Sequence, residues 1–265
     1  MIRKTFAASL IYGLLTFGVS AAEFDYSKPL APDQIRSFSG SIATAYKPIR
    51  SYYRTVDYQA VLKLGAKDLT FSNRTRESGS LKRHGQDLLW ESMSASTMIV
   101  NDESKIQNSE MRILLTPDGN IKEINTNSAE DQAIVEALTR VLNSIRPKSS
   151  VRLGEYLWHI DDITQQVSPL WPDMKVRNNT LVFRAIGIAA INGRNNLVID
   201  SSGQLEAEIP KFGQMYLRFP SQCLLDLPSG IWSGCVGVVR ISGNFLGQKI
   251  DLDIGMKSAW DFSAH

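Results

Sequence analysis

The sequence has few residues of the kinds that build metal centres and redox sites. Its 265 residues include only two cysteines and three histidines. The histidines, His84, His159 and His265, are scattered along the chain without the spacing of metal ligands. The cysteines, Cys223 and Cys235, do not form a C-x-x-C redox motif. We therefore expect no bound metal and no cofactor.

Recognisable catalytic motifs are also missing. The sequence has no G-x-S-x-G nucleophile elbow, phosphate-binding loop, H-E-x-x-H zinc motif or dinucleotide-binding glycine motif. The nearest approach to a catalytic cluster is W-H-I-D-D, in which His159 and Asp161 would share one face of a strand. A general base oriented by a carboxylate is one interpretation, which leaves a hydrolase as an alternative. A polar strand edge is the other interpretation, and we predict no catalytic residue and no enzyme activity.

Long hydrophobic runs are absent beyond the N-terminus. Residues 1–22 have the layout of a secretory signal peptide, with a basic start, an apolar run from Phe6 to Val19 and small residues up to Ala22. The apolar run is shorter than the roughly 20 residues that a membrane-spanning helix needs. We therefore expect residues 1–22 to be removed. The mature protein should then be periplasmic or otherwise secreted, without a transmembrane segment.

The sequence also lacks an excess of positive charge. The whole chain has 29 Lys and Arg against 27 Asp and Glu. Removal of residues 1–22 takes away Arg3 and Lys4 and no acidic residue, which leaves equal numbers of basic and acidic residues. Nucleic acid binding needs a clear positive excess on one face, so no nucleic acid partner is expected. The expected partners are a hydrophobic small molecule, a lipid or a protein of the cell envelope.

The two cysteines lie on either side of the turn sequence Pro228-Ser229-Gly230. Apolar residues precede and follow this turn, which predicts two neighbouring strands. An exported chain matures in an oxidising space, where paired cysteines tend to form disulfides. We therefore predict a disulfide between Cys223 and Cys235 that joins the two strands, with free buried thiols as the alternative.

Most of the chain shows the patterns of β-strands. Alternating apolar and polar residues from 51 to 64 are typical of a half-buried strand. The sequences Thr116-Pro117-Asp118-Gly119-Asn120 and Asn192-Gly193 predict hairpin turns. Further strands are predicted at Thr70–Arg76, Leu88–Ser94, Glu110–Leu115, Ile121–Asn125, Leu181–Ile191, Leu197–Asp200, Gln204–Ile209, Met215–Phe219, Gly234–Ser242 and Lys249–Met256. The predicted fold class is mainly β with a few helices, as a curved antiparallel sheet or unclosed β-barrel packed against helices.

Two segments show helical periodicity. Pro32-Asp33-Gln34 opens a first pattern, whose apolar residues recur at spacings of three and four: Ile35, Phe38, Ile42 and Tyr46. The clearer helix is predicted at Ala129–Arg146, with Ser128 as its N-cap and Pro147 as its stop. We expect one β-rich domain over residues 23–265. The alternative is two β halves, residues 50–127 and 151–265, joined by this helix.

The hairpin from Glu77 to Glu91, E-S-G-S-L-K-R-H-G-Q-D-L-L-W-E, resembles one in the periplasmic LolA/LppX-type lipoprotein and lipid carriers. His84 stands where that family has proline. The resemblance implies a strongly curved, unclosed β-barrel with helices across its mouth. It also implies a cavity that takes acyl chains or lipids.

These features favour an exported binding protein that holds a hydrophobic ligand, a lipid or a lipoprotein acyl chain, between a curved sheet and the helix at 129–146. Burial of apolar ligand surface would supply the affinity, at about 25 cal/mol per Å². A non-catalytic interaction or assembly factor of the cell envelope is the main alternative. The candidate ligand-lining residues are Trp90, Leu138, Leu142, Trp158 and Phe183.

Overall fold

The structure is a computed structural model of the 265-residue chain. It describes residues 29–64, 67–100, 103–127, 149–157, 174–191, 193–209, 213–218, 220–245 and 248–261. The predicted signal peptide and the predicted helix at Ala129–Arg146 lie outside these ranges. Within them, no helix is long and apolar enough to cross a membrane.

The described residues form one short 3-10 helix, η1 (Pro32–Gln34), and fifteen strands. The strands are β1 (Ser41–Ala43), β2 (Ile49–Leu64), β3 (Lys67–His84), β4 (Asp87–Val100), β5 (Glu103–Leu115), β6 (Ile121–Thr126), β7 (Ser150–Arg152), β8 (Lys175–Asn179), β9 (Val182–Ile191), β10 (Arg194–Ser202), β11 (Gln204–Ile209), β12 (Gly213–Arg218), β13 (Ser221–Asp226), β14 (Ile231–Phe245) and β15 (Gln248–Asp261). The protein is therefore mainly β, as predicted.

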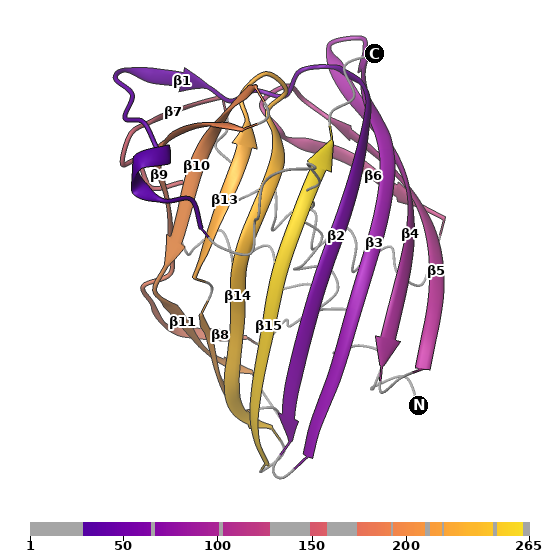
Figure 1. The fold of residues 1–265 in the computed structure, drawn as a ribbon, viewed down its shortest axis with the longest axis vertical. Helices are drawn as coiled ribbons and strands as arrows, with labels where there is room; N and C mark the ends of the chain where they lie inside the picture. The colour runs from indigo at the N-terminus through magenta and orange to yellow at the C-terminus, as the bar shows by residue number, and fades with distance from the viewer. Residues whose placement is uncertain are drawn as a thin grey trace.

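Thirteen strands belong to one curved sheet, in which every pair of neighbours is antiparallel (Figure 1). Along its main path the strand order is β6-β5-β4-β3-β2-β15-β14-β12-β11-β8. The sheet branches at β14, whose first half pairs with β13 and whose second half pairs with β12. From β13 the branch continues to β10 and β9, while β1 and β7 form a separate two-stranded sheet.

The strands β2 to β5 form a meander of long hairpins, at the right of Figure 1. The β3–β4 hairpin turns through Gly85 and Gln86, and Gly85 has a φ of +65°, which glycine adopts without steric cost. The turn predicted at Thr116–Asn120 is present between β5 and β6. There the Thr116 backbone N–H donates to the Asn120 carbonyl at 2.9 Å. Turn chemistry therefore sets where these hairpins reverse.

In the branch made of β9, β10 and β13, the strands β10 and β13 are buried on both faces. On β10, Leu197 and Ile199 belong to one hydrophobic cluster, whereas Val198 between them belongs to another. On β13, Leu225 belongs to the first cluster and Leu224 to the second. Alternate residues of a strand point to opposite faces, so the two clusters lie on opposite sides of this branch.

The helix predicted to begin at Pro32 is wrong. Only Pro32–Gln34 form a 3-10 turn, and β1 lies within the segment that follows. Ile35 packs against the second cluster, whereas Phe38 and Ile42 pack against the first. The spacings of three and four therefore arise because the segment contacts two separate clusters, not because its apolar residues share a helical face.

The predicted strands are at the right places, but several are too short. Gln204–Ile209 coincides with β11, whereas β4 continues to Val100, beyond the predicted end at Ser94. The added stretch of β4 contains Ser96, which is 5% exposed. The added stretch, A-S-T-M-I-V, lacks a clear alternation of apolar and polar residues, so the prediction ended the strand too early.

Candidate functional site on the inner face of β2 to β5

Alternate residues of β2, β3 and β4 are buried, and we call the side to which they point the inner face. Its buried members are Tyr52, Arg54, Val56, Asn73, Thr75, Glu77, Leu81, Leu88, Ser92 and Ser96. The strand register places Arg54 beside Glu77 and Thr75 beside Ser96. Six of these ten residues are polar or charged, which is unusual for a buried surface and marks this face as the candidate site.

The part of the inner face near the β3–β4 turn is apolar. Leu81, Leu88, Ile113 and Leu115 are each at most 3% exposed and belong to the second hydrophobic cluster. Trp90 is half-buried and packs against this cluster. Neighbouring strands therefore supply a continuous aliphatic and aromatic surface.

A chain of hydrogen bonds begins at Trp90, one of the predicted lining residues. The Trp90 Nε1–H donates to the Tyr52 hydroxyl at 2.7 Å, and this hydroxyl donates to Glu77 Oε1 at 2.5 Å. The other Glu77 oxygen lies 3.1 Å from the guanidinium of Arg54. A Cβ at Gly79 would lie 2.5 Å from the Tyr52 hydroxyl oxygen, so this network requires glycine at that position.

The Tyr52 hydroxyl is held in its protonated form. Burial, and then the negative charge of Glu77, raise the pKa of Tyr52 well above its ordinary value, while Arg54 acts in the opposite direction. Tyr52 can therefore donate to Glu77 throughout the physiological pH range. The network presents a hydroxyl and a paired carboxylate and guanidinium, and so carries polarity without net charge.

Small hydroxyl side chains occupy the inner face beyond this network, and we call Thr75, Ser92, Ser94, Ser96 and Ser109 the hydroxyl band. Two cross-strand pairs are formed within it: Thr75 Oγ1 lies 2.8 Å from Ser96 Oγ, and Ser94 Oγ lies 2.7 Å from Ser109 Oγ. The interior of a small barrel is normally filled by large side chains. The hydroxyl band therefore presents smaller side chains on this face than the apolar part does.

The described candidate residues lie in different parts of the core. Trp90 is on the inner face of β4, whereas Phe183 is on β9, is 3% exposed and belongs to the first cluster together with Cys223. The structure does not bring Trp90 and Phe183 into one cluster. The remaining named residues lie outside the described ranges: Leu138, Leu142, Trp158, His159 and Asp161.

Sequence reasoning missed Tyr52, Arg54 and Glu77. A signal was available, because Arg54 lies in the same alternating phase as Tyr52 and Val56, the phase that points to the core. A charged residue in a buried phase needs a partner. The partner could not be read from the sequence, because the pairing of Arg54 with Glu77 depends on the register of β2 against β3.

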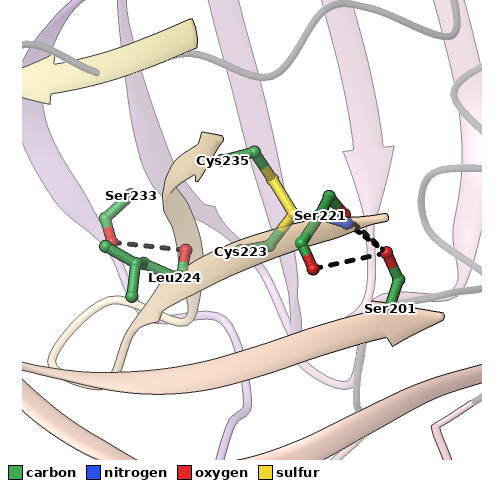
Figure 2. Close-up of a disulfide and its surroundings, with 6 residues drawn as sticks. All are labelled: Ser201, Ser221, Cys223, Leu224, Ser233 and Cys235. Atoms are coloured by element: carbon green, nitrogen blue, oxygen red, sulfur yellow. Dashed lines mark hydrogen bonds between the residues drawn. A yellow bond between two sulfur atoms is a disulfide. The ribbon is translucent and has the colours of Figure 1, made fainter. Parts of the chain in front are cut away.

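The predicted disulfide between Cys223 and Cys235 is present, and it joins β13 to β14 (Figure 2). The two residues lie directly opposite each other, with their Cα atoms 4.0 Å apart. Beside it, the Ser221 backbone N–H donates to Ser201 Oγ at 3.0 Å, which ties β13 to β10. The bridge closes a short loop and should stabilise the fold by about 2–3 kcal/mol.

Basic residues on the outer face of β3 are partly neutralised by acidic neighbours. Arg74 forms a two-point contact with Asp57, at 2.6 and 3.2 Å, and Lys82 lies 2.9 Å from Glu91. Among the described residues, no group of three or more His, Cys, Asp and Glu could hold a metal ion.

A separate surface hollow of about 590 Å³ lies beside β1 and β7. Its lining is Ser41, Ser150, Arg152, Leu153, Gly154 and Glu155. The Arg152 backbone N–H donates to Glu155 Oε2 at 2.7 Å, so the acidic side chain closes the turn after β7. This contact gives Glu155 a structural role.

No known family model matches the sequence, and no curated protein sequence matches it. Solved structures that are similar to it include the following two. A DUF1329 family protein from Desulfovibrio piger is 10% identical, with 82% of this chain and 87% of that chain covered and a TM-score of 0.22. DynF from the dynemicin biosynthesis pathway of Micromonospora chersina is 8% identical, with 92% and 96% covered and a TM-score of 0.21. At such low TM-scores neither likeness carries an argument about fold or function.

Proposed function

We propose that this chain is an exported binding protein that holds a lipid, an acyl chain or a similar hydrophobic ligand against the inner face of β2 to β5. The ligand's apolar part lies over the cluster around Leu81 and Trp90. Its polar end lies near Tyr52 and the hydroxyl band. The function includes no chemical step, and His159 and Asp161 take no part in it.

The observation that carries this proposal is the division of the inner face into an apolar part and a hydroxyl band. An apolar surface gains affinity from every area of ligand that leaves water. The hydroxyls of Thr75 and Ser96, and those of Ser94 and Ser109, already bond to each other, so covering them with a ligand leaves them satisfied. An amphiphile therefore matches both parts of the face.

Two sequence features support the same function. The β3–β4 hairpin, Glu77–Glu91, is the segment that resembles the LolA/LppX-type carriers, and its inner-face residues include Glu77, Leu81 and Trp90. The disulfide at Cys223 suits an oxidising compartment outside the cytoplasm. In this proposal the helix predicted at Ala129–Arg146 covers the inner face and turns its apolar stripe toward the ligand.

Native mass spectrometry of the mature protein, purified without detergent, tests the proposal directly. We expect a bound mass that organic extraction identifies as a lipid or fatty acyl compound. A protein that carries nothing, and that also fails to bind a fluorescent fatty acid at micromolar concentration, would contradict the proposal.

A filling variant tests the location. Ser94→Phe places a large ring within the hydroxyl band and should weaken binding of a fluorescent fatty acid at least ~10-fold, since it occupies ligand space. Ala95→Phe is the matched control, because Ala95 is the next residue of β4 and is exposed on the outer face. Both variants must unfold cooperatively. Equal binding by Ser94→Phe and Ala95→Phe would place the ligand elsewhere.

A further inference from the structure

Part of β5 has an open edge, at the right of Figure 1. β6 pairs with β5 only from Met111 to Leu115, and no strand of the described chain pairs with residues 103–109 on that side. Residues 104–108 are all exposed, and Ile106, at 68%, is the most exposed of the large hydrophobic residues described. An unpaired strand edge is a ready template for another strand.

Two other edges of the same sheet, those of β9 and β8, are protected. Along β9, the backbones of Arg36 and Ile188 exchange two hydrogen bonds, at 2.8 and 2.9 Å, and the Gly154 N–H donates to the Ala185 carbonyl at 2.8 Å. β8 is only five residues long and carries exposed Lys175 and Arg177. Both features discourage pairing with another chain. The open stretch of β5 is therefore not a general property of this sheet.

Contacts of Glu110 reveal which backbone groups face the open side. Its N–H donates to Asn127 Oδ1, and its carbonyl accepts from the Asn127 N–H, each at 3.3 Å and each on the side away from β4. In an antiparallel strand both backbone groups of one residue point to the same edge, and successive residues alternate. Ser104, Ile106 and Asn108 therefore direct their N–H and C=O groups to the open side.

We propose that this edge pairs with the same edge of a second copy of the chain, antiparallel, about a two-fold axis at Ile106. Ile106 then lies opposite its own copy, Ser104 lies opposite Asn108, and Lys105 lies opposite Gln107. Opposing residues point to the same face, so the two Ile106 side chains meet on the outer face. Ile99, which is 41% exposed and diagonal to Ile106, extends the buried apolar area.

The sequence of the edge favours this register. Ile106 is the middle residue of the stretch from Glu103 to Ser109, so an axis there allows every residue of the stretch to pair with the second copy. An axis at Lys105 would oppose two ammonium groups. An axis at Gln107 would oppose Glu103 and Met111, where β6 already pairs with β5 through Thr126. A second copy thus fits the open stretch best when its axis is at the most exposed apolar residue.

Sedimentation velocity on the full mature chain tests this pairing. A single short strand pair is a small interface, so we expect a reversible dimer with a Kd of about 10–100 µM. Ile106→Pro removes an N–H that points away from β4 and should weaken the dimer at least ~10-fold while the fold is kept. Ile106→Lys, which opposes two charges at the axis, should do the same if the proline variant is unstable. Met93→Lys is the control, because Met93 is 62% exposed on the outer face of β4, away from the edge, and should leave the Kd unchanged.

Crosslinking tests the register. Ile106→Cys should form an intermolecular disulfide on mild oxidation, because the residue faces its own copy, whereas Met93→Cys should not. A wild-type chain that stays monomeric at ~100 µM would overturn the proposal and leave a strand of another protein as the possible occupant. A dimer that persists in folded Ile106→Pro and Ile106→Lys would overturn it too, since that dimer would use another surface.

Discussion

The branch β9-β10-β13 and the wall β2–β5 are parts of one sheet, but they differ in what covers them. Strands β10 and β13 of the branch are buried on both faces, and β13 is joined to β14 by a disulfide. The wall is buried on one face, where more than half of the buried residues of β2 to β4 are polar, and its outer face carries exposed ion pairs such as Arg74–Asp57. The comparison indicates that the branch contributes more to the stability of the fold, whereas the wall carries the two faces for which binding is proposed.

Asp226 is the polar centre of the branch. Its carboxylate is fully buried, accepts two hydrogen bonds from Arg194, each at 2.7 Å, and accepts the Ser229 N–H at 2.9 Å. The turn that Asp226 organises contacts the N-terminal segment: a Cβ at Gly230 would lie 2.4 Å from the Ala45 carbonyl oxygen. The Asp226 side chain therefore links the β13–β14 turn to β10. The same turn packs against the segment around Ala45.

The largest expected effect comes from removing this carboxylate. Asp226→Ala leaves Arg194 and Ser229 without their acceptor and should lower the free energy of unfolding by about 3 kcal/mol. Asp57→Ala, which removes the exposed partner of Arg74, should cost no more than about 1 kcal/mol. Urea denaturation of the two variants measures both. Equal losses of unfolding free energy in the two variants would contradict the view that the branch contributes more to stability than the outer face of the wall.

A smaller effect is expected within the wall itself. Ser96→Ala leaves the buried Thr75 hydroxyl without its partner and should cost about 1 kcal/mol. Adding Thr75→Val removes the second hydroxyl as well, so the double variant should be more stable than Ser96→Ala. A double-mutant cycle in urea measures the coupling. Strictly additive losses would show that the hydroxyl pair does not act as a unit.

The smallest effect concerns the pH dependence of Asp200 in the branch. Burial raises the pKa of Asp200, and the hydrogen bond from Gln222 and the charge of Arg184 only partly offset it. The folded state thus binds this proton more tightly than the unfolded state. The contribution of this proton to the free energy of unfolding is complete below about pH 4, and it is lost as the pH rises through the pKa of Asp200 in the folded state. Thermal melts at increasing pH should show the wild type losing stability relative to Asp200→Asn. A difference in melting temperature that stays constant with pH would contradict this prediction.

Local signals in the sequence were sufficient to predict most of the long strands, the main turns and the disulfide. The turn at Thr116–Asn120 depends on residues that are neighbours in the chain, and the cysteines are 12 residues apart. A strand was predicted at Leu197–Asp200, and its L-V-I run is apolar on both faces. Features that depend on residues close together in the chain can therefore be predicted from the sequence.

The rest depends on pairing between distant segments. The network of Arg54, Glu77 and Tyr52 exists because β2 and β3 meet in one particular register. Trp90 and Phe183 were both predicted to line a ligand site. The structure places Trp90 against the second hydrophobic cluster, on the inner face, whereas Phe183 belongs to the first cluster. Neither the branching of the sheet at β14 nor the open edge at Ile106 leaves a local pattern in the sequence.

The pairing of β15 with β2 has a consequence for the order in which the protein can fold. Trp260 pairs with Arg54, so the final described strand completes the sheet beside its first long strand. While the chain emerges from a ribosome or a translocation pore, β2 to β6 and β8 to β14 can each form hairpins, but the two sets stay apart. Such distant pairing slows folding and leaves the sides of β2 and β14 uncovered in the meantime. Protection from aggregation during that interval, for example by a chaperone, should therefore matter more for this protein than for one built of local contacts.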